Sequence, residues 1–342
     1  MRIAIRRPFP PGGRNGIQSR GRGQPAAGGG VRTRVETTGG GGSGGGAAAP
    51  ARRGDGRWTV LEVVAWIAGD LARRGVSSPR LDAELLVGHA LGTSRVGLYV
   101  RHDAPLTEAE RAAVREALRR RRAGEPVAYI TGHREFWSVD LRVDRRVLVP
   151  RPETEVLVEE AFAALADEAA PWRVVDVGTG CGAIAAVVAK HRPAARVTAL
   201  DVSAEALAVA RENVTRLGLA ERVDLCEAEG AAWLAARPSS FDAVLANLPY
   251  VATGEFPGLQ VEVREHEPRG ALDGGPDGLR EIRRVVPAAA AALRPGGFLG
   301  LEIGADQGEA VVALCAAAGL VAPAVRRDYA GLCRVVTARR AS

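Results

Sequence analysis

The chain has 342 residues, enough for two domains with a proper hydrophobic core. Its net charge of +6 is concentrated in residues 1–57, where eleven arginines face only Glu36 and Asp55. The remainder is therefore about three units negative and does not indicate a nucleic-acid-binding surface.

The four cysteines are scattered without any CxxC pair, which argues against a zinc site or a disulfide framework and fits a reducing cytosol. No apolar run approaches the length of a membrane span, and the N-terminus lacks the hydrophobic region of a secretory signal. We therefore expect a cytoplasmic location, no membrane, and no bound metal.

Residues 1–57 are predicted to be a disordered Gly/Arg-rich extension. Seventeen glycines, with proline, serine and arginine and few aromatic residues, cannot bury enough surface to offset the entropy of ordering. Two interpretations stay open: a basic arm that touches RNA or the ribosome, and a dispensable tail or misplaced start codon.

Residues 58–125 are predicted to form a small helical domain, because helix start signals precede apolar residues at helical spacing. The signals are a capping box at Thr59 and Glu62, Ser78 before Pro79, and a second capping box at Thr107 and Glu110. The run Arg119–Arg122 is interpreted as a solvated helix end.

Residues 126–150 are predicted to be a β-hairpin linker, since 128–132 and 136–143 alternate like strands. From residue 151 to 342 strand-like and helical segments alternate, which predicts a doubly wound α/β fold. The last strand-like pair, 298–303 and 334–337, indicates an antiparallel edge strand on a parallel sheet. The other strands are expected at 173–177, 197–200, 223–226 and 241–246.

A glycine-rich loop follows the strand at 173–177. Its residues are Gly178, Thr179, Gly180, Cys181 and Gly182. Glycines allow a sharp turn and a close approach of the backbone to a ligand. The spacing departs from the dinucleotide pattern GxGxxG and suits S-adenosylmethionine, which has no pyrophosphate. An NAD or FAD site and a purely structural glycine turn are the alternatives.

Asp201 ends the next strand, nineteen residues beyond Gly182. A carboxylate at that place can accept both hydroxyls of a ribose. It could instead be an acid at the start of the helix that begins near Ser203. Glu229 and Gly230 follow the third strand and would lie beside the adenine, with an ordinary loop as the alternative.

The tetrapeptide Asn247-Leu248-Pro249-Tyr250 is predicted to carry the chemistry. An amide or aniline-like nitrogen is a poor nucleophile, so an enzyme must hold its hydrogens with acceptors and aim its lone pair at the sulfonium methyl. The Asn247 side-chain oxygen and the Leu248 carbonyl can be those acceptors. Pro249 stiffens the loop, and Tyr250 offers an aromatic face to the flat group. A proline turn with a core tyrosine is the structural alternative.

The chain resembles the HemK-like protein-(glutamine-N5) methyltransferases from about residue 58 to the C-terminus. The ordered matches are 124–132, Phe136-Trp137, 149–155, 174–182, Asn247–Tyr250, 267–269, 271–279 and 301–304. The resemblance implies a seven-stranded class I methyltransferase sheet that uses S-adenosylmethionine, with the small helical domain joined by the hairpin.

The same resemblance implies the substrate, the glutamine of the Gly-Gly-Gln loop in class I peptide chain release factors. It implies that residues 58–125 help to dock that factor. The segment Arg151–Glu155 looks like a lid beside the cofactor, in which Glu153 is the acid to test; a capped helix start is the alternative. We expect a monomer that binds no stable nucleic acid.

One departure concerns Leu248, because the family usually has Asn-Pro-Pro-Tyr. The change keeps the carbonyl and loses some rigidity, so Leu248→Pro should be tolerated. Asn-Leu-Pro-Tyr also occurs in rRNA adenine dimethylases, but residues 150–155 and the N-terminal helices favour the release-factor enzymes. N5-methylation of a ribosomal-protein glutamine is the runner-up, ahead of N6-adenine methylation of RNA. A chain that only binds release factors or ribosomes is the non-enzymatic alternative.

Overall fold

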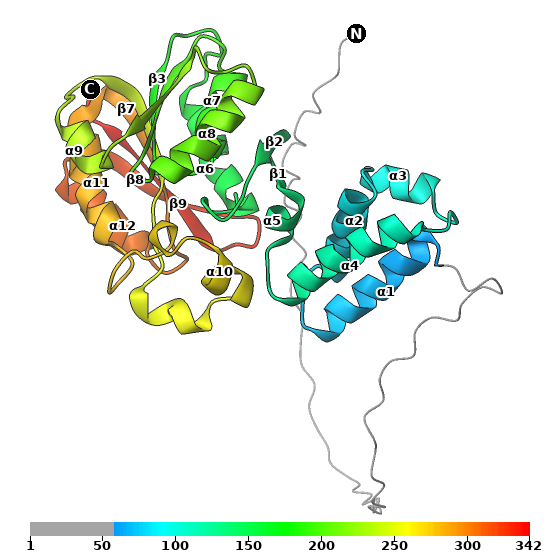
Figure 1. Cartoon of the computed structure of the whole chain (residues 1–342). Helices are drawn as coiled ribbons and strands as arrows, with labels where there is room; N and C mark the ends of the chain where they lie inside the picture. The colour runs from blue at the N-terminus through cyan, green and yellow to red at the C-terminus, as the bar shows by residue number, and fades with distance from the viewer. Residues whose placement is uncertain (1–57) are drawn as a thin grey trace, which may run out of the picture. The chain divides into compact units, whose positions relative to one another are not determined.

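A computed structural model describes residues 58–342, so the predicted disordered extension lies outside the described residues. The first described elements are helices, as predicted (Figure 1). They are α1 (Val60–Arg73), α2 (Pro79–Ala90), α3 (Arg95–Val100) and α4 (Glu108–Arg122). Their apolar faces form a core of their own around Ile67, Leu71, Leu86 and Leu98.

The predicted helix starts are confirmed in position. In α1 the Thr59 hydroxyl accepts from the Glu62 amide, and the Glu62 carboxylate accepts from the Thr59 amide at 2.9 Å. Thr107 and Glu110 form the same box at α4. Ser78 occupies the N-cap of α2 with Pro79 next, but its side chain makes no capping hydrogen bond.

The arginine run at the end of α4 is not simply a solvated helix end, which corrects that interpretation. Arg121 is only 9% exposed. Its guanidinium pairs with Asp82 of α2 at 2.8 Å and with Glu262 at 2.6 Å. Arg122 pairs with Asp70 of α1 at 2.8 Å. The side chains of this run therefore tie helices together, which sequence spacing could not show.

The hairpin is confirmed, with a shift in its start. Residues 128–132, predicted to be strand-like, instead belong to the short helix α5 (Val127–Thr131) and its C-cap Gly132. The strands are β1 (His133–Phe136) and β2 (Val139–Arg142), which pair antiparallel. A short apolar run does not distinguish strand from helix. Here Gly132 adopts a φ of 76° and ends the helix, a conformation that glycine reaches without strain.

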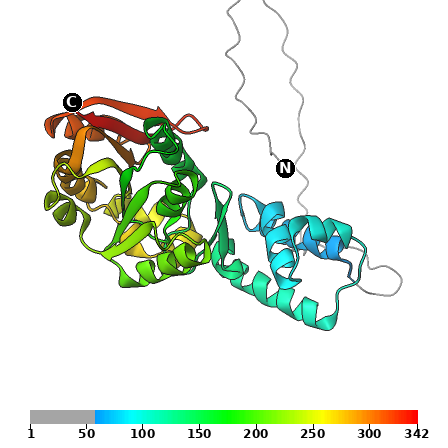
Figure 2. The same cartoon turned by 90° about the horizontal axis from the view of Figure 1, so that it is seen from above.

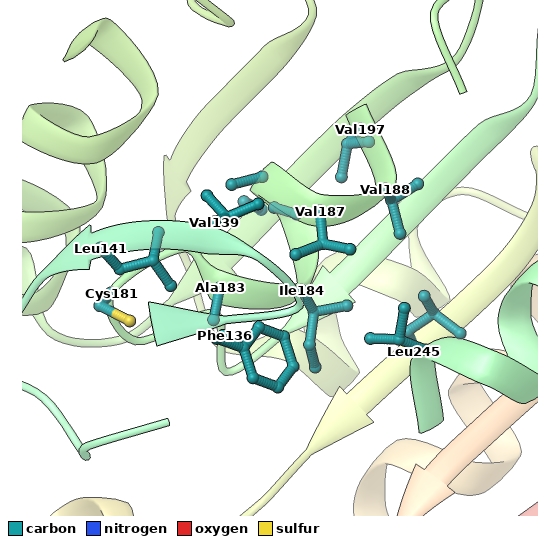
Figure 3. Packing of buried hydrophobic residues seen from close by; sticks show 14 of the residues in the cluster. Phe136, Val139, Leu141, Cys181, Ala183, Ile184, Val187, Val188, Val197 and Leu245 are labelled. Carbon is teal, nitrogen blue, oxygen red and sulfur yellow. The ribbon is translucent and has the colours of Figure 1, made fainter. Parts of the chain in front are cut away.

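The hairpin packs its apolar face onto the larger domain. Figure 3 shows Phe136, Val139 and Leu141 gathered with Cys181 and Ile184 in one buried cluster. Phe136 and Leu141 are among the largest fully buried side chains of the described residues. The hairpin is thus part of the core that supports the glycine-rich loop.

The larger domain contains a seven-stranded sheet with the order β5-β4-β3-β6-β7-β9-β8. Its strands are β3 (Arg173–Val177), β4 (Arg196–Asp201), β5 (Val223–Glu227), β6 (Phe241–Asn247), β7 (Leu293–Glu302), β8 (Leu320–Arg327) and β9 (Cys333–Arg340). β9 runs antiparallel to both of its neighbours, as predicted for that segment. It is not an edge strand, however, because β8, which the sequence pattern did not reveal, lies outside it.

Helices cover both faces of this sheet, which confirms the doubly wound α/β class (Figures 1 and 2). One face carries α6 (Glu155–Ala164), α7 (Ala183–His191) and α8 (Ala204–Arg216), and the other carries α9 (Gly230–Ala235), α11 (Arg280–Ala292) and α12 (Gly308–Ala317). Alternate strand residues point to opposite faces, so Val174 joins one core cluster and Val175 the other.

The remaining short elements lie in the connections. They are the 3₁₀ helices η1 (Pro152–Thr154), η2 (Thr253–Gly258) and η3 (Arg269–Ala271) and the helix α10 (Val261–His266). From β3 the chain adds β4 and β5 on one side, and it then returns to add β6 and β7 on the other side. The order of the strands therefore reverses between β3 and β6, which are neighbours in the sheet. The crevice at the carboxyl ends of strands around such a switch point is the usual ligand site of an open α/β sheet.

Candidate active site

The two predicted loops meet at the carboxyl ends of β3 and β6. A Cβ atom on Gly178 would lie 3.6 Å from both the Asn247 carbonyl oxygen and the Leu248 side chain. The structure therefore brings the glycine-rich loop and the Asn247–Tyr250 segment into contact, although 64 residues of the chain lie between Gly182 and Asn247.

Three glycines give the first loop its shape. Gly178, Gly180 and Gly182 have φ values of 73°, 55° and 82°. A Cβ atom on Gly182 would lie 3.3 Å from the Cβ of Ala210 in α8, whereas one on Gly180 would meet nothing within 4 Å. Gly182 thus permits close packing of a helix, while Gly180 leaves its backbone open to a ligand.

Asp176 is a functional candidate that the sequence analysis missed. Its side chain is fully buried in β3 and accepts from the Thr179 hydroxyl at 2.6 Å and the Ala185 amide at 3.1 Å. Burial raises the pKa of this carboxyl to about 7, against the opposing effect of the two hydrogen bonds. An acid inside the apolar run of a buried strand was the available signal.

Cys181 contributes backbone rather than thiol chemistry. Burial raises the pKa of its thiol to about 12, so the thiolate that would act as a nucleophile is disfavoured. Its carbonyl accepts from the Asn213 side chain of α8 at 2.9 Å. The residue therefore anchors the loop to α8.

Asp201 lies at the end of β4, against the glycine-rich loop. One carboxylate oxygen accepts from the Gly180 amide at 2.9 Å, and the other accepts from the Ser203 amide at 3.0 Å. Asp201 therefore binds the amide of Ser203 at the start of α8, as the helix-start interpretation expects, and it also contacts the glycine-rich loop. Each oxygen retains a lone pair, so binding of ribose hydroxyls stays a prediction.

Glu229 and Gly230 have local structural tasks. Glu229 is the N-cap of α9 and accepts from the amides of Ala231 and Ala232 at 3.1 and 2.8 Å. A Cβ atom on Gly230 would lie 2.4 Å from Val177, so glycine is required for α9 to approach β3. A position beside an adenine stays a prediction for both.

Asn247 is the last residue of β6, and its side-chain amide contacts Thr154 of η1. Its Nδ2 donates to the Thr154 hydroxyl at 3.2 Å. No donor among residues 58–342 reaches its Oδ1. The acceptor end of this amide is consequently available to a ligand.

The rest of the tetrapeptide is held by its surroundings. Leu248 is buried in the same core cluster as residues of α11 and α12. The Tyr250 carbonyl accepts from Gln307 Nε2 at 2.9 Å, and the Tyr250 hydroxyl donates to Glu302 Oε1 at 3.3 Å. Burial raises the pKa of the Tyr250 phenol, which keeps it a hydrogen-bond donor.

Two glycines of the 271–279 segment lie close against the backbone of the tetrapeptide. Cβ atoms on Gly274 and Gly278 would lie 2.6 Å from the Pro249 carbonyl and 2.2 Å from the Tyr250 carbonyl, respectively. Any side chain there would displace the tetrapeptide. This segment therefore forms the backing of the Asn247–Tyr250 loop.

Glu302, at the end of β7, is a second acid that the sequence analysis did not place in the site. It is 1% exposed. Burial raises the pKa of its carboxyl to about 7, opposed by the side chains of Thr154, Arg334 and Tyr250. It is the register partner of Asn247 and accepts a hydrogen bond from the Tyr250 hydroxyl, so it lies against the Asn247–Tyr250 loop.

The segment Arg151–Glu155 lies beside Asn247. Thr154 in η1 is buried against Asn247, while Glu153 is exposed. Arg151 is fixed by an ion pair with the buried Glu267 at 2.5 Å. The predicted start of a helix is also present, since α6 follows η1 directly. A lid function, and a substrate contact by Glu153, stay predictions.

Among residues 58–342 no group of three or more His, Cys, Asp or Glu side chains is arranged to hold a metal ion. In the same part of the chain, no helix has the length and apolar character needed to cross a membrane.

Comparison with known proteins gives family matches in both domains. The PrmC N-terminal domain family matches residues 62–132, and the methyltransferase small domain family matches residues 154–261. These ranges follow the order of the helical region and the sheet. They agree with the resemblance stated from the motifs.

Several curated relatives are similar over most of their length. A release factor glutamine methyltransferase of Moorella thermoacetica is 48% identical over 271 residues, which cover 79% of this chain and 94% of that protein. One of Geobacter sulfurreducens is 43% identical over 282 residues, covering 82% and 97%.

Among solved structures, a release-factor-specific protein-(glutamine-N5) methyltransferase from Alicyclobacillus acidocaldarius is 29% identical. The match covers 59% of this chain and 100% of that chain with a TM-score of 0.38.

Proposed function

Because this chain belongs to the release factor glutamine methyltransferase family, we propose that it methylates the glutamine of the Gly-Gly-Gln motif in class I peptide chain release factors. The methyl donor is S-adenosylmethionine and the acceptor atom is N5 of the side-chain amide. The observation that carries this assignment is the open acceptor end of Asn247 beside the glycine-rich loop.

The residues at the ends of β3 and β4 fit the proposed donor. Gly180 presents backbone without a neighbour within 4 Å of its Cβ position, and Asp201 has lone pairs left for hydroxyl groups. Gly178, Gly182, Thr179 and Cys181 would shape the pocket, and Glu229 and Gly230 would border the adenine. When bound, S-adenosylmethionine supplies a methyl group on a positively charged sulfur, which is already activated for transfer.

The task left to the protein is to present a weak nucleophile. The lone pair of an amide nitrogen is delocalised, so both of its hydrogens must be held while the lone pair faces the methyl group. Asn247 Oδ1 and the Leu248 carbonyl would accept these two hydrogens. Pro249 limits the freedom of that carbonyl, and the Tyr250 ring would pack against the planar amide.

The substrate protein would approach over Arg151–Glu155, where Glu153 is exposed and free to contact it. Residues 58–125 would contribute to docking. We further infer that the enzyme acts in the cytoplasm as a monomer and without stably bound nucleic acid. Size-exclusion chromatography with light scattering tests the oligomeric state.

The proposal is tested by incubating the protein with methyl-labelled S-adenosylmethionine and a class I release factor. A matched release factor, with the glutamine of its Gly-Gly-Gln motif changed to alanine, is the control. Label in the first protein and none in the second is the expected result. Mass spectrometry of the labelled peptide would then locate the methyl group on N5.

Label in neither factor, with cofactor binding intact by isothermal titration, would overturn the proposed substrate. A ribosomal-protein glutamine and then ribosomal RNA would be assayed next. Absence of cofactor binding would instead favour a chain that only binds its partner.

A further inference from the structure

Three polar side chains from separate elements meet behind the tetrapeptide. Asn247 ends β6, and Glu302 ends β7 and is its register partner in the parallel pair of strands. Thr154 comes from η1, 93 residues before Asn247, and is 4% exposed. The sheet pairing and the packing of η1 therefore create this cluster.

The hydrogens in the cluster can be assigned from the donors and acceptors alone. Asn247 Nδ2 donates to the Thr154 hydroxyl oxygen at 3.2 Å. The single hydrogen of that hydroxyl then needs an acceptor of its own. The acid next to this cluster is Glu302, the register partner of Asn247, and the Thr154 side chain works against the rise of its pKa.

The carboxyl of Glu302 has one oxygen that can still accept a hydrogen bond. Its Oε1 already accepts from the Tyr250 hydroxyl at 3.3 Å. Its buried Oε2 accepts no hydrogen bond from any group within residues 58–342, so this oxygen is left as an acceptor for the Thr154 hydrogen. No ion pair joins Glu302 to Arg334, whose partner is Asp328 at 3.3 Å.

The direction of these bonds determines which end of the Asn247 amide faces the substrate. In its ionised form Glu302 accepts and cannot donate, so the Thr154 hydrogen then points to Glu302 while the Thr154 oxygen accepts from Asn247. Oδ1 then faces away from Thr154. With the amide turned over, Nδ2 would oppose the N–H groups of a glutamine amide, and donors would face donors.

We propose that Thr154 and Glu302 are positioning residues, which orient the Asn247 amide so that its oxygen receives the substrate amide. This inference rests on the proposed function. It also accounts for a buried carboxyl that has no ion-pair partner among the described residues. Such a group costs stability, and a glutamine or an apolar residue would avoid the cost of burying a charge.

The experiment compares Thr154→Val with Thr154→Ser in the full chain. Valine keeps the shape and loses the hydroxyl, while serine keeps the hydroxyl. We expect Thr154→Val to lower kcat for release-factor methylation about tenfold, on the order of one lost hydrogen bond to an aligned group. KM for the factor and the Kd for S-adenosylmethionine should change less than about twofold, and Thr154→Ser should restore most of kcat.

Thr337→Val is the matched control, because Thr337 is a buried threonine of β9 whose hydroxyl donates to the Ala324 carbonyl at 3.5 Å. It should leave kcat unchanged. Glu302→Gln should lower kcat about as much as Thr154→Val. The double variant should be no slower than the slower single variant, because both changes break one chain of hydrogen bonds.

Three results would overturn the inference: an unchanged kcat in Thr154→Val, an equal loss in Thr154→Ser, or effects of Thr154→Val and Glu302→Gln that multiply. If Thr154→Val does not fold, the inference is decided by Glu302→Gln, and an unchanged kcat there overturns it. A wild-type protein that labels no release factor would refute the proposed function. A wild-type protein that labels it, beside an equally active Thr154→Val, would refute the inference alone.

Discussion

The two loops of the site are held in place in different ways. The glycine-rich loop is fixed by close neighbours in the βαβ unit, since Asp176, the Leu200 carbonyl and Asp201 take its polar groups. The Asn247–Tyr250 loop is fixed by side chains from distant segments. Thr154 is 93 residues away from Asn247, and Gln307 is 57 residues away from Tyr250.

This difference indicates what each loop does. The first loop uses backbone conformation, which glycines encode directly, to leave space for a ligand. The second must present two acceptors in one orientation, and a single short segment cannot fix an amide by itself. Changes in the first loop should therefore act on cofactor binding, and changes in the second on the rate of methyl transfer.

The largest effect is expected for Asn247→Ala. It removes an acceptor that would act on the reacting nitrogen, so kcat should fall on the order of 10²–10³-fold. The Kd for S-adenosylmethionine should stay close to that of the wild type in isothermal titration. Retention of more than about a tenth of the turnover would contradict the acceptor role.

Asp201→Ala should act on the other loop. Loss of a charged acceptor at the proposed ribose position, together with its bond to the Gly180 amide, should raise the Kd for S-adenosylmethionine about 10- to 100-fold. Asp224→Ala is the control, because Asp224 is an exposed acid on the neighbouring strand β5. Equal Kd values for the two variants would show that the ribose assignment is wrong.

Leu248→Pro should separate stability from activity. The Leu248 side chain is buried, so its loss should lower the free energy of unfolding by about 1–3 kcal/mol in urea titrations. Because the carbonyl is retained, kcat per folded enzyme should stay within about threefold of the wild type. A collapse of kcat in folded protein would show that the leucine side chain, and not only its carbonyl, positions the substrate.

The smallest effect concerns pH, because each loop has one buried carboxyl with a raised pKa. Asp176 and Glu302 titrate near 7 in the folded protein, against ordinary values of 3.8 and 4.5. The folded state therefore holds protons that the unfolded state has lost. The stability contribution is complete below about pH 4 and is lost as pH rises through 7.

Between pH 6 and 8 each group should lower the free energy of unfolding by about 1 kcal/mol. Asp176→Asn and Glu302→Gln should each remove their share of this slope in urea titrations at several pH values. A wild-type stability that rises over this interval would contradict the raised pKa values.

Much of the site could be read from consecutive residues. Glycines at fixed spacing, an acid at the end of a strand and an Asn-x-Pro-aromatic tetrapeptide encode their local geometry directly, and the structure brings Gly178, Asp201 and Asn247 to one edge of the sheet. The helix starts at Thr59 and Thr107 were readable for the same reason, because a capping box needs only four residues.

The errors arose where a pattern was short or its partner distant. Residues 127–131 are apolar and could form either a strand or a helix, and the left-handed turn at Gly132 decided for the helix. Arg121 looks like any arginine of a charged helix end until α2 and Glu262 are packed against it. β9 lies inside the sheet because β8 pairs with its outer edge, and the sequence pattern did not reveal β8.

The sequence by itself thus determined the doubly wound fold, the family and the residues that carry the proposed chemistry, because backbone conformation and strand ends depend on neighbouring residues. Only the tertiary structure decided which way the Asn247 amide faces. The two side chains proposed to orient it reach it only in the folded protein, because Glu302 becomes the register partner of Asn247 when β6 pairs with β7, and Thr154 comes within 3.2 Å when η1 packs beside them.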